Sequence, residues 1–276
     1  MSWMRLPLTR VDAFATRAFE GNPAAVMPLT EWLSDAMLRA IAAENNLSET
    51  AFLVPDDSDD ADYELRWFTP TQEIALCGHA TLASGHVLLS AGQWRSDMRF
   101  RTRQAGILTV SRDPDAADDD NSYRLSLPAF SAAPKPLPDI VAAVGGAPLE
   151  TLWHERGYAL LVYADADAVR ALAPDMAALR RFGDIATIAT APGGDDASGA
   201  DVVSRVFVPG AGIDEDPVTG AAHCVLTPYW TPRLDRDRFA AYQASARGGH
   251  VGCRIDGDRV ELTGRCVTTL VGDVLL

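Results

Sequence analysis

The sequence predicts an α+β protein built from two similar α/β halves. The chain has 276 residues, which suits one large domain or two domains of ordinary size. Strand-like and helix-like segments alternate along it. A motif of the form R-x-F-x-P also occurs twice, as Arg66, Phe68 and Pro70 and again as Arg205, Phe207 and Pro209. Repetition of whole halves indicates a pseudo-symmetric two-domain body.

The repeat extends beyond this motif. RWFTPTQEIALCGHATLASGHVL (66–88) and RVFVPGAGIDEDPVTGAAHCVL (205–226) each read as a strand, a turn and the start of a helix. Carried forward without a gap, the offset places Cys77 opposite Asp216. Each turn leads into a helix N-terminus, where free N–H groups and a partial positive charge favour an anion. If the halves face each other, the two helix ends form a site for a carboxylate and for a developing enolate.

In the first half, the pattern predicts strands followed by helices. A helix over 31–45 begins after Thr30 as its N-cap and has one apolar face. A second helix covers about 80–90, and RFRTRQAGILTVSRD (99–113) alternates as a hairpin around 104–106. The predicted strands are LTRVDAFA (8–15), AAVMPL (24–29), SETAFLV (48–54) and YELRWFT (63–69).

The second half follows a Pro/Ala/Ser-rich segment, Pro128–Pro138, which is predicted to be a linker. Pro228 is expected to end the helix that follows Asp216, and the tail from Val260 reads as two strands. The other predicted elements are helices at 139–145, 167–172 and from Pro174, and strands at 157–164, 185–191 and 202–209. The expected domains are 1–127, completed by a C-terminal strand at about 265–276, and 128–264.

Composition excludes several functions. The net charge of −14 comes largely from aspartate-rich stretches at 55–62, 113–121 and 193–201, which read as solvated loops. An acidic chain is a poor partner for nucleic acid. No apolar run approaches the length of a membrane span and the N-terminus lacks a secretory signal, so we expect a soluble, cytoplasmic protein with no membrane partner. The four cysteines show no paired spacing and are expected to be free thiols.

Cofactor motifs are also missing from the sequence. The single lysine, Lys135, lies in the predicted linker, whereas a pyridoxal-phosphate enzyme needs a lysine for its Schiff base. The chain has no P-loop, no G-x-G-x-x-G after a strand and no G-x-S-x-G. We therefore expect no cofactor.

Two segments of the first half carry candidate catalytic groups. Glu49, in ENNLSETAFLV, could be a general acid/base or a carboxylate that accepts backbone N–H bonds. Cys77 could be an activated thiolate or a small buried hydrophobe. Gly78 permits close approach of a ligand, and His79 could be an acid, a base or a structural histidine.

The turn of the second half offers a matching set. Asp216 could be catalytic or could only cap the helix, and Ala221 can contact a ligand through its backbone alone. His223 and Cys224 are expected to be packing residues. Cys77, His79, His223 and Cys224 together resemble a Cys2His2 zinc set, but their spacings, C-x-H and H-C, are poor for zinc, so no metal is expected.

These motifs together resemble the phenazine-biosynthesis isomerase (PhzF-like) family. The resemblance rests on VDAFATRAFEGNPAAV, ENNLSETAFL, WFTPTQEIALCGHATLASGHV and VFVPGAGIDEDPVTGAAHCVLTPYW, in that order over nearly the whole chain. It implies the diaminopimelate epimerase-like fold, with two pseudo-symmetric α/β domains, mixed sheets wrapped around a central helix, and an active-site cleft between the domains.

The resemblance also implies a reaction. A cofactor-independent isomerase would use Glu49 as the single acid/base, moving a proton on a small carboxylated metabolite that is amino-acid-like or cyclic and unsaturated. His79 and Asp216 would assist. Substrate binding would fall to the remaining candidates: Asn22, Cys77, Gly78, Thr219, Gly220 and Ala221. The family usually has serine at the position of Ala221, so a different substrate is plausible.

Two other functions stay open, and the resemblance adds a partner. One alternative is a cysteine-assisted racemase or epimerase that uses Cys77 and Asp216 as an unequal pair. The other is a non-catalytic ligand-binding or interaction protein on the same fold. The resemblance implies a homodimer, which light scattering at micromolar concentration would test.

Overall fold

The computed structural model of the chain describes residues 4–91, 95–117 and 120–276. The chain forms two compact units. Unit 1 comprises 1–126 and 263–276, and unit 2 comprises 127–262. The chain therefore enters unit 2 one residue earlier than the sequence predicted and leaves it two residues earlier. Within the described ranges, no helix is long and apolar enough to cross a membrane.

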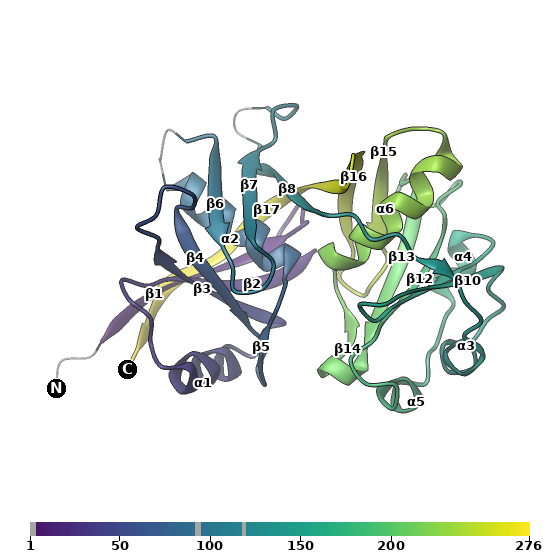
Figure 1. The fold of residues 1–276 in the computed structure, drawn as a ribbon, viewed down its shortest axis with the longest axis horizontal. Coiled ribbons are helices and arrows are strands. Elements are labelled where there is room, and N and C mark those ends of the chain that lie inside the picture. Colours follow the sequence, from purple (N-terminus) through teal and green to yellow (C-terminus); the bar gives the residue numbers. More distant parts are fainter. Residues whose placement is uncertain (1–3, 92–94, 118–119) are drawn as a thin grey trace. The chain divides into compact units, whose positions relative to one another are not determined.

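In its described ranges, unit 1 is a mixed sheet accompanied by the helices α1 and α2 (Figure 1). Along the sheet, the strands lie in the order β17, β1, β2, β3, β4, β6, β7, β8, and β8 pairs in turn with β17. The short β5 pairs with β4. The elements are β1 (Arg5–Ala13), β2 (Asn22–Pro28), α1 (Asp35–Asn45), β3 (Glu49–Pro55), β4 (Tyr63–Phe68), β5 (Glu73–Ile74), α2 (Gly78–Ser90), β6 (Asp97–Arg101), β7 (Ile107–Arg112), β8 (Ser122–Pro128) and β17 (Arg259–Leu275).

Unit 2 repeats this arrangement. Its strands lie in the order β9, β10, β11, β12, β13, β15, β16, and the short β14 pairs with β13. The elements are β9 (Ala133–Pro134), α3 (Pro138–Val144), β10 (Glu150–His154), β11 (Tyr158–Val162), α4 (Ala166–Arg170), α5 (Met176–Arg180), β12 (Ala186–Pro192), β13 (Val202–Val208), the 3-10 turn η1 (Pro209–Ala211), β14 (Ile213–Asp216), α6 (Gly220–Leu234), β15 (Arg238–Gln243) and β16 (Gly249–Asp256).

The pairing directions match strand for strand. From β1 through β7, successive neighbours pair antiparallel, parallel, antiparallel, parallel and antiparallel, and the same series runs from β10 through β16. The prediction of two pseudo-symmetric α/β halves with mixed sheets is therefore confirmed.

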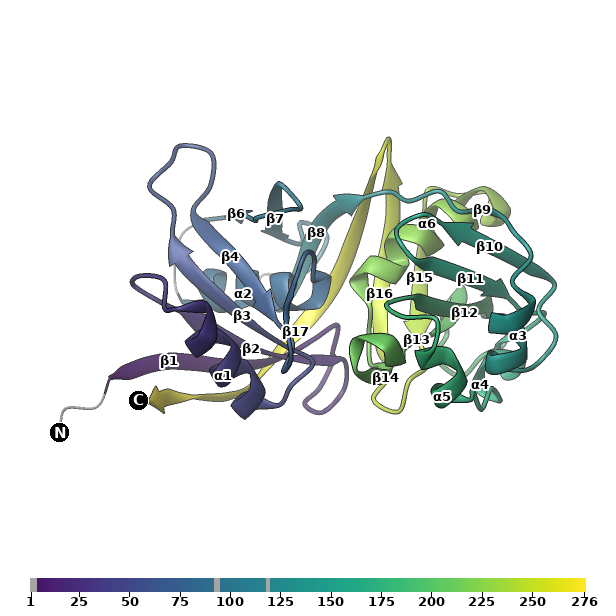
Figure 2. The ribbon, with the colours of Figure 1, turned by 60° about the horizontal axis from the view of Figure 1, so that its bottom comes forward.

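Each sheet has one apolar helix against its inner face. In unit 1, α2 contacts β1, β2, β3, β6 and β7, and eleven of its thirteen residues are buried. In unit 2, α6 is packed against β11 and β16. The outer face of the first sheet is covered by α1 (Figure 2). Its Leu38, Ile41 and Ala42 belong to one buried cluster with Phe52 and Phe68. A buried apolar helix is covered along all its sides, so only its ends can contribute to a site. For these two central helices, the end of interest is the N-terminus.

The structure corrects the ungapped alignment of the two repeats. Phe68 pairs with Glu73, and the corresponding Phe207 pairs with Glu215, three residues further along. The turn η1 fills the additional length. Cys77 is the N-cap residue of α2, and the N-cap residue of α6 is Thr219. The counterpart of Cys77 is therefore Thr219 and not Asp216.

The start of the first helix was also predicted wrongly. The helix α1 begins at Asp35, with Ser34 as its N-cap, and Thr30 lies outside it. The Ser34 hydroxyl accepts a hydrogen bond from the Met37 N–H (3.3 Å). A serine that satisfies one of the free N–H groups of a first turn fixes the helix start there.

Pro228 does not end its helix, contrary to the prediction. The helix α6 continues to Leu234, through Pro228 and Pro232. A proline inside a helix leaves the carbonyl four residues earlier without its usual N–H partner. Here that carbonyl, of Cys224, accepts a hydrogen bond from the Phe130 N–H (2.9 Å). Phe130 lies in the segment predicted as a linker, so this segment is part of unit 2, where it also contributes β9.

The tail is one strand and not two. The strand β17 runs over 17 residues, and a register shift opposite Arg10 and Val11 of β1 lets it stay paired. The sequence did not predict β5, β8, β10 or the strands at 238–256. The predicted hairpin at 99–113 is confirmed as β6 and β7.

Two buried histidines predict how stability depends on pH. Burial lowers the pKa of His86 and of His223 to about 4, from an ordinary 6.5. The unfolded chain therefore binds more protons than the native protein between pH 4 and 6.5, and the stability that each neutral imidazole provides is lost as the pH falls through this window. By pH 5, each should cost about 2 kcal/mol.

Denaturant unfolding between pH 7 and pH 5 tests this expectation. The native stability should fall with the pH, and His86→Gln and His223→Gln should each make the fall less steep. An identical pH dependence in the double variant would contradict the assignment.

Candidate active site

Three adjacent elements of unit 1 bring four of the predicted site residues together. Asn22 begins β2, Glu49 begins the neighbouring β3, and Cys77 and His79 lie at the start of α2. Because β2 and β3 run parallel, with Ala24 opposite Glu49, the first residues of both strands lie at the same end of the sheet. The N-terminus of α2 lies next to these strand ends.

His79 is the centre of this cluster. Its Nε2 lies 3.0 Å from Oε2 of Glu49, an ion-pair contact in which neither atom has an aligned hydrogen bond within the described part of the chain. On the other side of the ring, Nδ1 lies 3.1 Å from Nδ2 of Asn22 and 3.6 Å from Sγ of Cys77. All four side chains are buried: Asn22 is 0%, His79 3%, Cys77 5% and Glu49 8% exposed.

The electrostatics of the cluster favour a charged His79. Burial lowers the pKa of His79, but the neighbouring Cys77 and Glu49 raise it more, so that it lies well above its ordinary value. Burial, followed by the charge of Glu49, raises the pKa of the Cys77 thiol to about 11. At neutral pH Cys77 is therefore a neutral thiol whose charge does not act on His79, so of the two neighbours Glu49 is the one that favours the protonated ring.

The same three groups are the strongest candidate for a metal site among the described residues. One ligand atom each from Glu49, Cys77 and His79 lies within 4.8 Å of the others. However, Glu49 faces Nε2 and Cys77 faces Nδ1 of one imidazole ring. A single ion can bind only one of these nitrogens, so the order Glu49–His79–Cys77 fits a proton relay better than a chelate.

The loop before Asn22 is shaped by features that sequence reasoning missed. The Phe19 N–H donates to the buried Asp12 carboxylate (2.7 Å). Phe14 and Phe19 both have positive φ, at 58° and 75°, which is rare for bulky residues. Gly21 also has a positive φ, of 63°, and a Cβ there would lie 2.1 Å from the Ala13 carbonyl oxygen. The string F-x-G-N-P was a signal for this turn, because glycine tolerates such a backbone.

In unit 2, Asp216 and Thr219 form a second polar cluster. The Thr219 hydroxyl donates to Oδ2 of Asp216 (2.5 Å), and Asp216 is 7% exposed. Gln243, fully buried on β15, holds this turn: its Oε1 accepts the Thr219 N–H (2.8 Å) and its Nε2 donates to the Asp216 carbonyl (2.7 Å). Nothing in the sequence around Gln243 signalled this role, because it is 24 residues beyond Thr219 and contacts the turn only through the sheet.

The two central helices begin at residues predicted to bind substrate. Gly78 and Gly220 are the first residues of α2 and α6, and within the described ranges neither N-cap residue, Cys77 or Thr219, makes a side-chain capping bond. Ala221, the second residue of α6, offers only its backbone to a ligand. Two helix N-termini without side-chain caps retain N–H groups for an anion.

Two further residues behave as the sequence suggested. His223 Nδ1 donates to the Thr219 carbonyl (2.8 Å), and Cys224 Sγ contacts the Gly220 carbonyl one turn back (3.7 Å). Both side chains are fully buried. All four cysteines are buried and free, as predicted.

Comparison with families of known proteins gives one match over most of the chain. The model of the family described as "Phenazine biosynthesis-like protein" matches residues 11–272. An uncharacterised isomerase of Pseudomonas aeruginosa is 41% identical over 99% of this chain and 100% of its own. A second uncharacterised isomerase of that species is 44% identical over the same shares. A phenazine biosynthesis-like domain-containing protein of mouse is 36% identical, over 98% of this chain and 99% of its own.

Comparison with solved structures finds the same family. A PhzF-family protein of Enterococcus faecalis has a TM-score of 0.88 and 39% identity, over 99% of this chain and 100% of its own. A hydroxyproline epimerase of Agrobacterium vitis has a TM-score of 0.64 at 14% identity, over 99% and 93%. At this identity, the similarity to the epimerase concerns the fold alone: the two proteins share an architecture.

Proposed function

Because the chain belongs to the phenazine biosynthesis-like family, whose bacterial relatives are named isomerases, we propose that it is a cofactor-independent isomerase using one carboxylate, Glu49, as general acid/base. The substrate is a small carboxylated metabolite, amino-acid-like or cyclic and unsaturated. Glu49 removes a proton from a carbon next to a carbonyl or conjugated system and returns it to another carbon of the same molecule. The net reaction moves one proton and needs no redox partner.

The observation that carries this proposal is the buried contact between Glu49 and His79. The Glu49 carboxylate lies 3.0 Å from an imidazole whose pKa is raised, so the two groups are placed to pass a proton between them. When Glu49 takes the proton from carbon, His79 remains as a second donor for an oxygen anion that develops on the substrate. Asn22 contacts the far side of the ring through its side-chain amide, which lies 3.1 Å from Nδ1.

We further propose that unit 2 contributes Asp216 as an assisting group and the N–H groups at the start of α6 as a carboxylate-binding site. The support is local. Asp216 is buried and held by Thr219 and Gln243, and α6 begins with Gly220 and Ala221, two small residues whose N–H groups are at the helix N-terminus. The start of α2 at Gly78 offers the same kind of N–H groups.

Proton exchange from solvent tests the proposed function. The protein is incubated in D2O with a panel of carboxylated cyclic dienes and amino acids, and deuterium at carbon is read by NMR. Incorporation into a panel compound is the expected result. If no compound exchanges while one of them raises the melting temperature, the fold serves binding alone and the proposal is wrong.

The cysteine-assisted racemase is tested in the same assay. A neutral thiol with a pKa of about 11 is a poor base at neutral pH, so the exchange should survive replacement of Cys77 by serine. Loss of exchange after treatment with iodoacetamide, with substrate protecting Cys77, would favour the cysteine mechanism over Glu49.

A homodimer and a cytoplasmic location remain proposals. Support for self-association comes from the end of β17, where Leu270, Val271 and Leu275 are 48%, 76% and 54% exposed. Exposed apolar side chains on a strand favour pairing with another chain. Light scattering at micromolar concentration should give twice the monomer mass, and a monomer would refute the proposal.

A further inference from the structure

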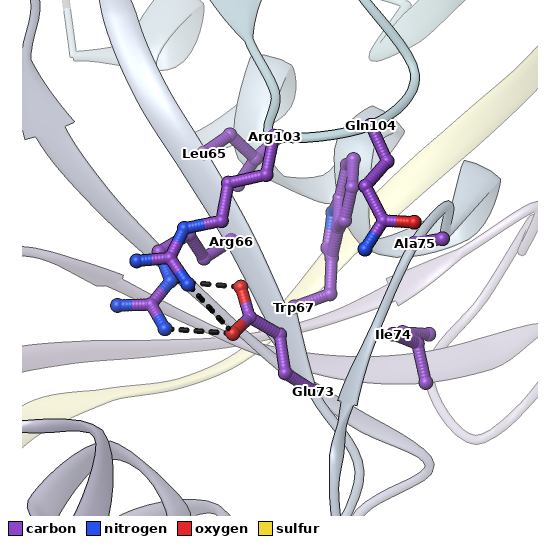
Figure 3. A pocket seen from close by; sticks show the side chains of 8 residues that line it. All are labelled: Leu65, Arg66, Trp67, Glu73, Ile74, Ala75, Arg103 and Gln104. Atoms are coloured by element: carbon purple, nitrogen blue, oxygen red, sulfur yellow. Dashed lines mark hydrogen bonds and ion pairs between the residues drawn. The ribbon is translucent and has the colours of Figure 1, made fainter.

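The repeated R-x-F-x-P motif has a structural role in both units that the proposed reaction does not use. In unit 1, the Arg66 guanidinium makes two hydrogen bonds with the Glu73 carboxylate, Nε to Oε1 (2.8 Å) and Nη2 to Oε2 (2.7 Å) (Figure 3). In unit 2, Arg205 makes the same two bonds to Glu215, at 2.8 and 2.9 Å. Each pair joins a long strand to the short strand beside it.

The surroundings of the two arginines are repeated as well. The Arg66 guanidinium lies 5.0 Å from the ring centre of Phe68, and that of Arg205 lies 5.0 Å from the ring centre of Phe207. The arginine side chains are 4% and 13% exposed and their glutamates 25% and 22%, so each ion pair is partly buried, with the guanidinium on the inner side. A bidentate pair with a stacked ring fixes the plane of the guanidinium and therefore the position of the carboxylate.

Each arginine also contacts the N- or C-terminal end of a helix. Arg66 donates to Asp35, the first residue of α1 (2.8 Å). Arg205 donates to the Leu172 carbonyl, just beyond α4 (2.7 Å). The short strand is thereby attached through one side chain to a helix on the outer face of its sheet.

The number of residues between the arginine, the glutamate and the central helix indicates which segment the ion pair holds in position. From arginine to glutamate there are seven residues in unit 1 and ten in unit 2. From glutamate to the first residue of the central helix there are five in both, Glu73 to Gly78 and Glu215 to Gly220. The loop between the strands tolerates three extra residues, whereas the path from the glutamate to the helix start has the same length in both repeats.

We propose that Arg66 and Arg205 are positioning residues that act through Glu73 and Glu215 to place the turns holding Cys77–His79 and Asp216–Gly220. The inference rests on the proposed function for its catalytic meaning, although the positioning can be measured without a substrate. The strand β5 has two residues and pairs with β4 at two positions, so the ion pair is a large part of what holds the turn.

Histidine NMR tests the positioning, because each turn contacts a different histidine. His79 lies in the first turn, and His223 donates to the Thr219 carbonyl of the second. Arg66→Lys keeps the charge but loses the bidentate contact. It should move the His79 imidazole resonances and lower the pKa of His79 as the contact with Glu49 loosens, with His223 unchanged. Arg205→Lys should give the reverse pattern.

Arg103→Lys is the matched control, since Arg103 also contacts Glu73 (3.1 Å) but is 56% exposed and makes one bond (Figure 3). It should leave both histidines unchanged. If Arg66→Lys does not fold, Glu73→Gln, which retains the side-chain volume, gives the same reading. A His79 resonance and pKa that are the same in Arg66→Lys or Glu73→Gln as in the wild type would overturn the proposal.

Once an exchanging substrate is known, a second readout applies. Displacement of the turn should lower kcat about tenfold or more and change KM little, because a small misplacement acts on the reacting geometry. An unchanged kcat with the NMR effects present would leave the positioning intact and refute its catalytic meaning. Absence of exchange in the wild type, with a panel compound raising its melting temperature, would reject the proposed function and leave the positioning seen by NMR unaffected.

Discussion

Replacement of Glu49 by glutamine should lower the rate of carbon–deuterium exchange by about 10²- to 10⁴-fold, the range supplied by a general acid/base. Glutamine has nearly the same shape but cannot accept the proton. The fold should survive, because Glu49 is the first residue of β3 and its backbone pairing is unaffected. The measurement is deuterium incorporation by NMR with the compound that the wild type exchanges most rapidly.

The same variant has an effect that needs no substrate. Without the Glu49 carboxylate, a charge that holds the proton on His79 is lost, so the pKa of His79 should fall. Glu44→Gln is the matched control, because Glu44 is an exposed carboxylate on α1. Full exchange activity in Glu49→Gln, with Glu44→Gln also active, would exclude Glu49 as the base.

Gly21→Ala should be the most destabilising of the small substitutions at the site, at about 3 kcal/mol or more. The new Cβ would lie 2.1 Å from the Ala13 carbonyl oxygen, and backbone atoms cannot move aside as the end of a side chain can. Alanine would also have to adopt a φ of 63°. Because Asn22 follows directly, the shift should also disturb its contact with His79. Thermal unfolding measures the loss, expected as a fall in Tm of about 10 °C.

Gly106→Ala separates the two causes. Gly106 has a φ of 72°, and a Cβ there would have no atom within 4 Å. Gly106→Ala should therefore lose only the free energy needed to hold alanine at a positive φ, about 1 kcal/mol. Equal losses in the two variants would show that the clash with Ala13 is relieved at no cost, contrary to this prediction.

The sequence was most informative where the chemistry depends on residue type over a short span. Turn signals and apolar patterns placed Asn22 in a loop before a strand, Glu49 near the start of a strand, and Cys77 and His79 in a turn before a helix. Their convergence follows from parallel pairing of β2 and β3, which strand order alone does not give. The assignment of their catalytic roles came from the family resemblance and awaits the exchange measurements.

The errors have local physical causes. A proline in a helical pattern predicts an end, yet α6 passes Pro228 because the Phe130 N–H, almost a hundred residues earlier, satisfies the Cys224 carbonyl. The ungapped alignment of the repeats placed Cys77 opposite Asp216, because it did not allow for the additional turn η1 in the second repeat. Gln243 was missed because it meets Thr219 and Asp216 only through the sheet.

The sequence by itself determined the two α/β halves, the family and the types of residue available for chemistry. These follow from periodicity and short motifs, which act over a few residues. Tertiary structure decided the proton-holding contact of Glu49 with His79, the neutral state of Cys77 and the paired arginine–glutamate contacts. Each of these depends on burial and on distances between segments far apart in the chain, and both quantities exist only after the strands have paired.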